Sequence, residues 1–416
     1  MRRIFVLSTL FILIVSSAIV AQEKTALDSL ISEALEENPG VQAAYDEWQA
    51  AEFKAQHAGS LPDPMASYAH FGQNVETRVG PQENKYGLSQ KIPFPGKLSL
   101  KTKAQEKHAA VFKEKYEAAQ RELTKNVKFV YYDIFWVERA IQTTEEEKAI
   151  LESLEKVAQR RYESNMTPQQ DVIKAQVELS KLIDKLFVLN RNRRSLEAKM
   201  NSLLNRPKGT ALAPVENVEL TPFAYSLEQL HVIALDEAEQ LSVANLSVER
   251  AEYEKSLARL DYFPDFTVGV DYTQVGGGHT SAANDGQDAW MGKVAVTLPI
   301  WFGKLNAQMD EKKAALEASK NNYENIENIL AYEVEDLFYK ISTYYDTISL
   351  YKTALLPQTE QAFDAAKTSY ETGKVDFLNW LDAERVLLQT RLTYYKAIVD
   401  YQKSIAYLER VVGKDL

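Results

Sequence analysis

The sequence predicts a mainly α-helical chain with a smaller β part, in which one plan is repeated along 416 residues. Three observations support this fold class. Long apolar seams carry coiled-coil spacing, similar tracts recur about 200 residues apart, and a pair of short alternating segments precedes each set of seams. Because 45% of the residues are apolar, the chain can form a large core or two domains.

The first 21 residues have the three parts of a secretory signal peptide. Arg2 and Arg3 precede an apolar run over 4–15, and small residues follow up to Ala21. An uncleaved anchor is the alternative, but the run is shorter than the roughly 20 residues that a spanning helix needs. We therefore expect export, with cleavage after Ala21 and a mature chain that begins at residue 22; cleavage after Ala18 is the alternative.

Composition excludes several classes of function. Acidic residues outnumber basic ones by 59 to 48, which argues against a partner made of nucleic acid. The chain has no cysteine, so disulfides, thiolate metal sites and cysteine nucleophiles are excluded. Its 5 histidines show no metal-ligand spacing. We expect no enzyme, no metal site and no cofactor.

Each half opens with a predicted helix, over 25–59 and 226–262, that ends at a proline-bearing break. Two predicted strands follow in each half, and each segment of about ten residues suits a tilted crossing of a bilayer. The strands cover about 65–79, 85–92, 266–275 and 290–300.

Alternation is clearest in the third of these strands. One face carries Phe266, Val268, Val270 and Tyr272, and the other carries Thr267, Gly269, Asp271 and Thr273. Four strands cannot close a barrel, and open edges are not tolerated in lipid, so several chains would have to pool their strands. Three copies would supply twelve. The alternative is a soluble four-stranded sheet on one side of a helical body.

The helical seams predict one antiparallel hairpin in each half. The first hairpin covers 98–205 and the second covers 304–412. The apolar seams of their outgoing helices keep one register, with a constant shift of 207 residues. The first seam consists of Leu123, Val127, Val130, Ile134, Val137 and Ile141. The second consists of Leu330, Val334, Leu337, Ile341, Tyr344 and Ile348. The two repeats are therefore expected over 22–215 and 216–416.

The turns of the hairpins have their own signals. Asn165 and Gly373 are the residue types that most readily accept a left-handed conformation at a helix end. Thr167 before Pro168 reads as an N-cap followed by proline in the first turn. Pro357 is expected to kink or interrupt the second hairpin.

Three tracts, in this order and duplicated arrangement, carry a resemblance to a known family. They are SQKIPFPGKL at 89–98, YESNMTPQQDV at 162–172 and YETGKVDFLNWLDAERVLLQ at 370–389. Together they resemble TolC-family outer-membrane efflux proteins over essentially the whole mature chain. The tract DPMASYAHF at 63–71 makes the chain most similar to the CusC/CzcC-like heavy-metal branch.

The resemblance implies a homotrimer with a 12-stranded transmembrane β-barrel in outer-membrane lipid and an α-helical tunnel across the periplasm. Such proteins are passive exit ducts of tripartite efflux or type I secretion systems. Their partners are a periplasmic adaptor (a membrane fusion protein) and an inner-membrane pump. The alternative is a periplasmic adaptor or coiled-coil scaffold without a pore.

The resemblance also assigns roles to residues at the turns. The tips that adaptor hairpins grip in the family match Asn165, Met166, Thr167 and Gly373, Lys374, Val375. The periplasmic aperture matches Asp382 and Asn379, together with Asp171 after the first tip.

Three copies of Asp382 around a narrow axis would repel one another and favour cations. The neutral Asn379 leaves one acidic ring where the family has two. The alternative for Asp382 is an ordinary charge on a helix surface.

Overall fold

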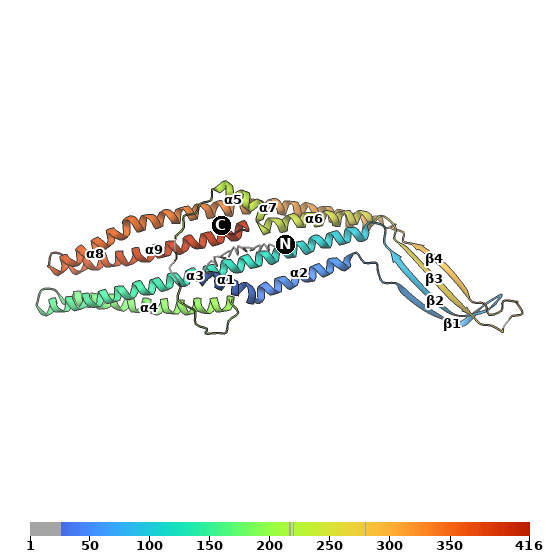
Figure 1. Cartoon of the computed structure of the whole chain (residues 1–416), viewed down its shortest axis with the longest axis horizontal. Coiled ribbons are helices and arrows are strands. Elements are labelled where there is room, and N and C mark those ends of the chain that lie inside the picture. Colours follow the sequence, from blue (N-terminus) through green and yellow to red (C-terminus); the bar gives the residue numbers. More distant parts are fainter. Residues whose placement is uncertain (1–25, 216–217, 219, 279) are drawn as a thin grey trace, which may run out of the picture.

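The computed structural model describes residues 26–215, 218, 220–278 and 280–416. The predicted signal peptide, 1–21, lies outside these residues. The described chain is elongated, with helical hairpins at one end and a β-sheet at the other (Figure 1). Within the described ranges, none of the helices combines the length and the apolar character that a membrane crossing requires.

The element order of the first part of the chain recurs in the second. The first series is α1 (Ala26–Glu37), α2 (Pro39–Ala58), β1 (Met65–Thr77), β2 (Gly80–Ile92), α3 (Lys97–Glu163) and α4 (Gln169–Leu203). The second is α5 (Leu227–Glu237), α6 (Glu239–Leu260), β3 (Phe266–Val275), β4 (Ala289–Val296), α7 (Phe302–Leu350), the π-helical turn η1 (Tyr351–Leu355), α8 (Leu356–Glu371) and α9 (Phe377–Val412).

Each leading helix is broken once, so the expectation of a single helix over 25–59 and another over 226–262 was wrong. Asn38 is extended because the ring of Pro39 disfavours a helical residue before it, and its side chain accepts the amide of Gly40 at 2.8 Å. The second break, at Ala238, has no proline. At this break the end of α9 packs against the chain, with Gly413 next to the main chain of residues 237–238.

The four strands form one antiparallel sheet in the order β1-β2-β3-β4. Consequently β1 and β4 are the two edges, and within the described residues neither edge has a further partner strand. The sheet extends beyond the helices at the far end of the molecule (Figure 1).

The first connection in the sheet is shorter than expected. We expected a polar loop before a strand over 85–92, but β2 begins at Gly80, after a turn of two residues. The hydroxyl of Thr77 donates to the carbonyl of Gly80 at 2.6 Å and closes this turn. β1 therefore ends at Thr77, two residues before the expected limit.

The last strand is also shorter than expected. β3 matches its expected range, whereas β4 ends at Val296 instead of residue 300. Thr297 still donates its amide to Asp265 at 2.9 Å, but Pro299 has no amide hydrogen to continue the ladder.

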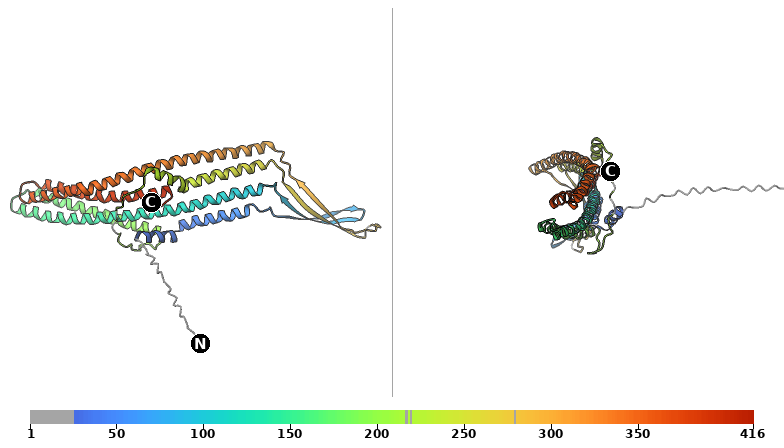
Figure 2. Two further views of the ribbon diagram at one scale, coloured as in Figure 1. Left: turned by 45° about the horizontal axis from the view of Figure 1, so that its top comes forward. Right: turned by 90° about the vertical axis from the view of Figure 1, so that its left-hand side faces the viewer.

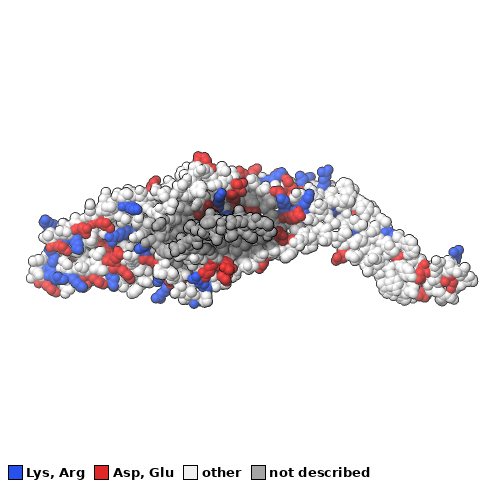
Figure 3. Space-filling view, viewed as in Figure 1, with Lys and Arg blue, Asp and Glu red and all other residues white. Residues whose placement is uncertain are grey.

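One face of the sheet is apolar and exposed. Its side chains include a row of aromatic residues that crosses all four strands in register: Tyr68, Tyr86, Tyr272 and Trp290. Trp290 is 78% exposed, so the chain's own helices do not cover this face. This exposure contradicts the alternative of a sheet packed on a helical body. In the view of Figure 3 most of the sheet end is uncharged, and its acidic and basic side chains gather mainly toward the far tip.

The opposite face is polar. Asp271 is buried there between two cations, with Lys85 at 3.0 Å and Lys293 at 2.6 Å. The glycine at position 87 leaves room for this carboxylate, because an added Cβ would lie 2.7 Å from one of its oxygens. The sheet thus has one apolar face and one polar face.

The predicted apolar seams form the core of the hairpins. Val127, Val130 and Ile134 of α3 are buried, as are Val334 and Ile341 of α7. The expected interruption of the second hairpin is confirmed, because the π-helical turn η1 ends two residues before Pro357. At 67 residues, α3 spans about 100 Å.

α3 connects the two halves, since it contacts α2 and α6 toward the sheet and α4 and α9 toward the tips. Viewed along the long axis, the helices form a curved layer that is open on one side (Figure 2).

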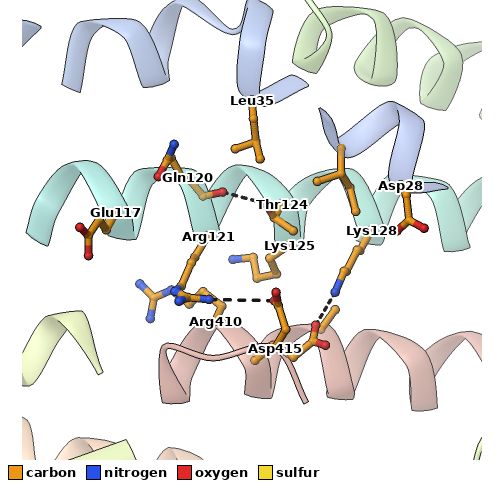
Figure 4. Close-up of a pocket in the computed structure, with 13 residues that line it drawn as sticks. Asp28, Leu35, Glu117, Gln120, Arg121, Thr124, Lys125, Lys128, Arg410 and Asp415 are labelled. Carbon is orange, nitrogen blue, oxygen red and sulfur yellow. Dashed lines mark hydrogen bonds and ion pairs between the residues drawn. The ribbon is translucent and has the colours of Figure 1, made fainter. Parts of the chain in front are cut away.

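A polar cavity of about 680 Å³ lies between α1, α3 and the end of α9 (Figure 4). Its basic side chains are Arg121, Lys125, Lys128 and Arg410, and its acidic ones are Asp28, Glu117, Glu409 and Asp415. Lys128 and Glu409 are 2.5 Å apart, and Arg121 and Asp415 are 4.0 Å apart. Because the charges balance, the cavity favours neither anions nor cations.

Candidate functional site at the hairpin tips

The two hairpins turn through the same backbone geometry. Asn165 has φ 58° and Gly373 has φ 75°, so both adopt the predicted left-handed conformation. In each tip the next amide donates a hydrogen bond of 2.8 Å to a carbonyl five positions back, at Arg161 and at Ser369. These are Schellman closures, so the outgoing helices of the two hairpins end in the same manner.

The expected tip residues differ in exposure. Met166 is 68% exposed, and Lys374 is also exposed. Val375 is half-buried and packs against the apolar cluster of the hairpins. A partner that binds these tips therefore meets an apolar side chain on the first tip and a cation on the second.

The expectation that Thr167 is an N-cap was wrong. Pro168 occupies the cap position of α4, and the half-buried hydroxyl of Thr167 has no hydrogen-bond partner among the described residues. The second tip is capped by a side chain, because Asp376 accepts the amide of Asn379 at 3.0 Å. A proline in the cap position has no side-chain acceptor, which explains the difference.

Arg161 joins the two tips, and the sequence analysis did not identify it. Its guanidinium donates to the main-chain carbonyls of Tyr370 at 2.7 Å and Glu371 at 3.1 Å. It also lies over the ring of Tyr370, 5.0 Å from the centroid. The last carbonyls of α8 are thus satisfied by a side chain from the other hairpin.

Asp171 lies in the first turn of α4 and is half-buried. Burial has the largest effect and raises the pKa of this carboxyl. The charge of Asp376 also raises this pKa, whereas the charges of Lys174 and Arg161 lower it. Asp171 therefore belongs to the electrostatic cluster around Arg161 rather than to an open surface.

Asn379 and Asp382 are both exposed on the first two turns of α9. Three positions apart on a helix, they lie on one face. Among the described residues, no hydrogen bond or ion pair connects Asp171 with either of them. The structure therefore brings Asp171 to the contact between the tips, and leaves Asn379 and Asp382 on an uncovered face of α9.

Two arginines attach α9 to its neighbours above the tips. Arg385 is paired with Glu178 of α4, and Arg391 donates to Glu360 of α8 at 3.1 Å. These partners are far apart in sequence, so no local motif marks them. They hold the helix that carries Asp382 against both hairpins.

A sheet with one apolar face, joined to long hairpins with exposed tips, defines a subunit of an outer-membrane channel. The family model described as outer membrane efflux protein matches residues 30–206 and 230–414. The chain belongs to this outer membrane efflux protein family.

Named relatives agree with this assignment. The cobalt-zinc-cadmium resistance protein CzcC of Cupriavidus metallidurans is 22% identical over 392 residues, which cover 93% of this chain and 90% of CzcC. The structure of the outer-membrane channel OprN has a TM-score of 0.80 at 15% identity and covers 93% of this chain and 89% of its own. The structure of CusC has a TM-score of 0.77 at 20% identity, and the match covers 93% of this chain and 92% of CusC.

The chain is therefore an outer-membrane exit duct of the efflux type, extending into the periplasm, and not an enzyme. Its family works with adaptor and pump partners. The alternative of an adaptor or scaffold without a pore is wrong, since the family match covers both halves of the chain.

Proposed function

We propose that the protein works as a homotrimer, in which three copies of the sheet close a 12-stranded barrel and three curved helical layers close a tunnel. The observation that carries this proposal is the open sheet. It has an exposed apolar face and two unpartnered edges, β1 and β4, within the described residues. In lipid, unpaired edge amides and carbonyls cost several kcal/mol each, so β1 of one copy must pair with β4 of the next.

Disulfide trapping tests the pairing of β1 with β4. The chain has no cysteine, so paired substitutions on β1 and β4 introduce the only thiols. Because these strands are opposite edges of one sheet, a disulfide between them must join two copies. We expect oxidation to produce a three-chain species on a non-reducing gel for at least one register. A matched pair on the central strands β2 and β3 should give only one chain.

We further propose that the tips formed by Asn165, Met166, Thr167 and by Gly373, Lys374, Val375 dock a periplasmic adaptor. Their exposure and their shared backbone closure support this role. We also propose that Asp382, Asn379 and Asp171 line the aperture, where three copies of Asp382 would form one acidic ring.

We propose that the cargo of the duct is a divalent metal cation, which the pump would load. The name of the relative CzcC and the acidic ring of Asp382 support this choice. Among the described residues, no group of three or more His, Cys, Asp and Glu side chains could hold a metal ion. In the host, deletion of the gene should lower resistance to cobalt, zinc or cadmium. An unchanged metal resistance, with increased sensitivity to dyes or detergents, would contradict the metal assignment.

We retain two proposals on the organisation of the chain. The signal peptide is cleaved after Ala21, and the repeats cover 22–215 and 216–416. Determination of the mature N-terminus tests the first, and the similar order of elements in the two series supports the second.

A further inference from the structure

Two carboxyl groups from different hairpins are buried together in the apolar layer above the tips. Glu147 of α3 is fully buried, and Glu384 of α9 is 2% exposed. Among the described residues, neither oxygen of Glu147 has a hydrogen-bond donor within reach. The neighbouring group is the carboxyl of Glu384, which can donate a hydrogen bond only if it carries a proton.

Every packed element contributes a charged group near this pair, and the cations among them partly offset its charge. On α9, a guanidinium nitrogen of Arg391 lies 3.8 Å from Glu147, beyond hydrogen-bond distance, and this side chain also serves Glu360 of α8. Arg385 pairs with Glu178 of α4. Two more charges face the pair, those of Glu146 on α3 and Lys185 on α4.

Burial explains the protonation of this site. Desolvation by the surrounding apolar side chains raises the pKa of both carboxyls, and the charge of Glu147 raises that of Glu384 further, to about 8. Two neighbouring anions that are both buried would repel each other in a medium of low dielectric constant. At neutral pH the pair therefore holds one proton, and the protonated carboxyl donates a hydrogen bond to the other.

We propose that Glu147 and Glu384 form a proton-dependent contact that holds the two hairpins together and loosens when the shared proton leaves. The contact joins α3 to α9, the helix that carries the exposed Asp382. If α9 lines the aperture, which rests on the proposed function, an alkaline periplasm would loosen the packing of the hairpins there. The contact between the hairpins itself does not depend on that function.

The sign of the pH effect follows from proton linkage. In the packed state the pair retains a proton that two solvated carboxylates lose near their ordinary pKa of 4.5. The packing is thus strongest below that pH and is weakened progressively as the pH rises toward 8. Since the separated state binds one proton fewer, its population should rise about tenfold for each pH unit between about 5 and 8.

Amide hydrogen exchange of the detergent-purified full-length protein tests the proposal. Rates at pH 6.5 and 7.5, corrected for intrinsic exchange, report the opening of the segments around residues 140–158 and 377–392. We expect protection in these segments to fall about tenfold in the wild type. In Glu384→Gln, which keeps the side-chain volume but cannot ionise, protection should be the same at both pH values.

Glu145→Gln is the matched control, because this neighbouring acid of α3 is exposed, and it should behave as the wild type. If Glu384→Gln does not fold, Glu147→Gln removes the same charge pair from the opposite side. Equal protection of the wild type at both pH values would overturn the proposal, and so would a tenfold loss that persists in the folded glutamine variant. Conductance at pH 6.5 in planar bilayers tests the channel function separately. Because a pore conducts whether or not the contact titrates, this measurement distinguishes a failure of the proposed contact from a failure of the channel function.

Discussion

The guanidinium of Arg161, near the end of α3, donates a hydrogen bond of 2.7 Å to the main-chain carbonyl of Tyr370 in α8. The two residues are 209 positions apart and belong to different hairpins. The second hairpin thus completes its helix end with a donor from the first. The two tips are fixed relative to each other within one chain, as a docking surface that combines both tips requires.

Replacing Arg161 should loosen the tips without unfolding the chain. Arg161→Ala removes both hydrogen bonds and the contact with the ring of Tyr370, and we expect a local loss of about 1–2 kcal/mol because the site is only half-buried. Limited proteolysis at 160–170 and 369–378 measures this change. Arg160→Ala is the control, since that side chain is exposed. Equal cleavage rates for the two variants would show that Arg161 has no part in fixing the tips.

The left-handed turns predict which substitutions the tips accept. Gly373→Asn and Asn165→Gly exchange the residue types that the two tips already use, and both variants should retain efflux. Gly373→Val forces a β-branched residue into φ 75°, at a cost of about 1–2 kcal/mol. Asn165→Glu changes the charge of the proposed docking surface. We expect both of these variants to lose efflux in a resistance assay while still forming trimers. Full resistance from folded trimers would remove the tips from the docking proposal.

The aperture proposal predicts a change in ion selectivity. Asp382→Ala should reduce the preference for cations in planar bilayers at low salt, where screening is weak. Asn379→Asp adds a second acidic ring one turn away and should increase that preference. The reversal potential in a salt gradient measures both effects. If neither substitution moves it, Asp382 is an ordinary surface charge.

The packing of the C-terminal helix end predicts a specific requirement for glycine. Gly413 has φ 75°, and an added Cβ would lie 2.1 Å from the carbonyl oxygen of Glu237. We expect Gly413→Ala to destabilise the protein by about 2–3 kcal/mol, as strain and overpacking do. Gly303→Ala is the control, because no atom lies within 4 Å of an added Cβ in that first turn of α7. Denaturant unfolding should show a lower midpoint for Gly413→Ala alone.

Periodic features of the fold could be predicted from the sequence. The seams around Val127 and Val334 lie in the core, and the turns at Asn165 and Gly373 have the expected backbone. These features depend on local spacing and on the conformational preference of single residues. The break at Ala238 could not be predicted in this way, because it is made by a contact with Gly413 from the far end of the chain.

Contacts between the hairpins were harder to find. Arg161 carries no motif, and its acceptors are main-chain carbonyls, which every residue has. The pair formed by Glu147 and Glu384 did leave a signal. Glu147 lies three positions after the buried Thr144 and four before the buried Leu151, and a carboxyl at such a position needs a partner. The identity of that partner depends on how two segments 237 residues apart are packed.

The most direct test of the account is the number of chains in the detergent-extracted mature protein. Native mass spectrometry should give particles of three chains that remain together only in detergent or lipid, because the exposed apolar face and the open edges of the sheet must be covered. A single chain that is stable in aqueous buffer without detergent would contradict the pooled barrel and the duct built on it.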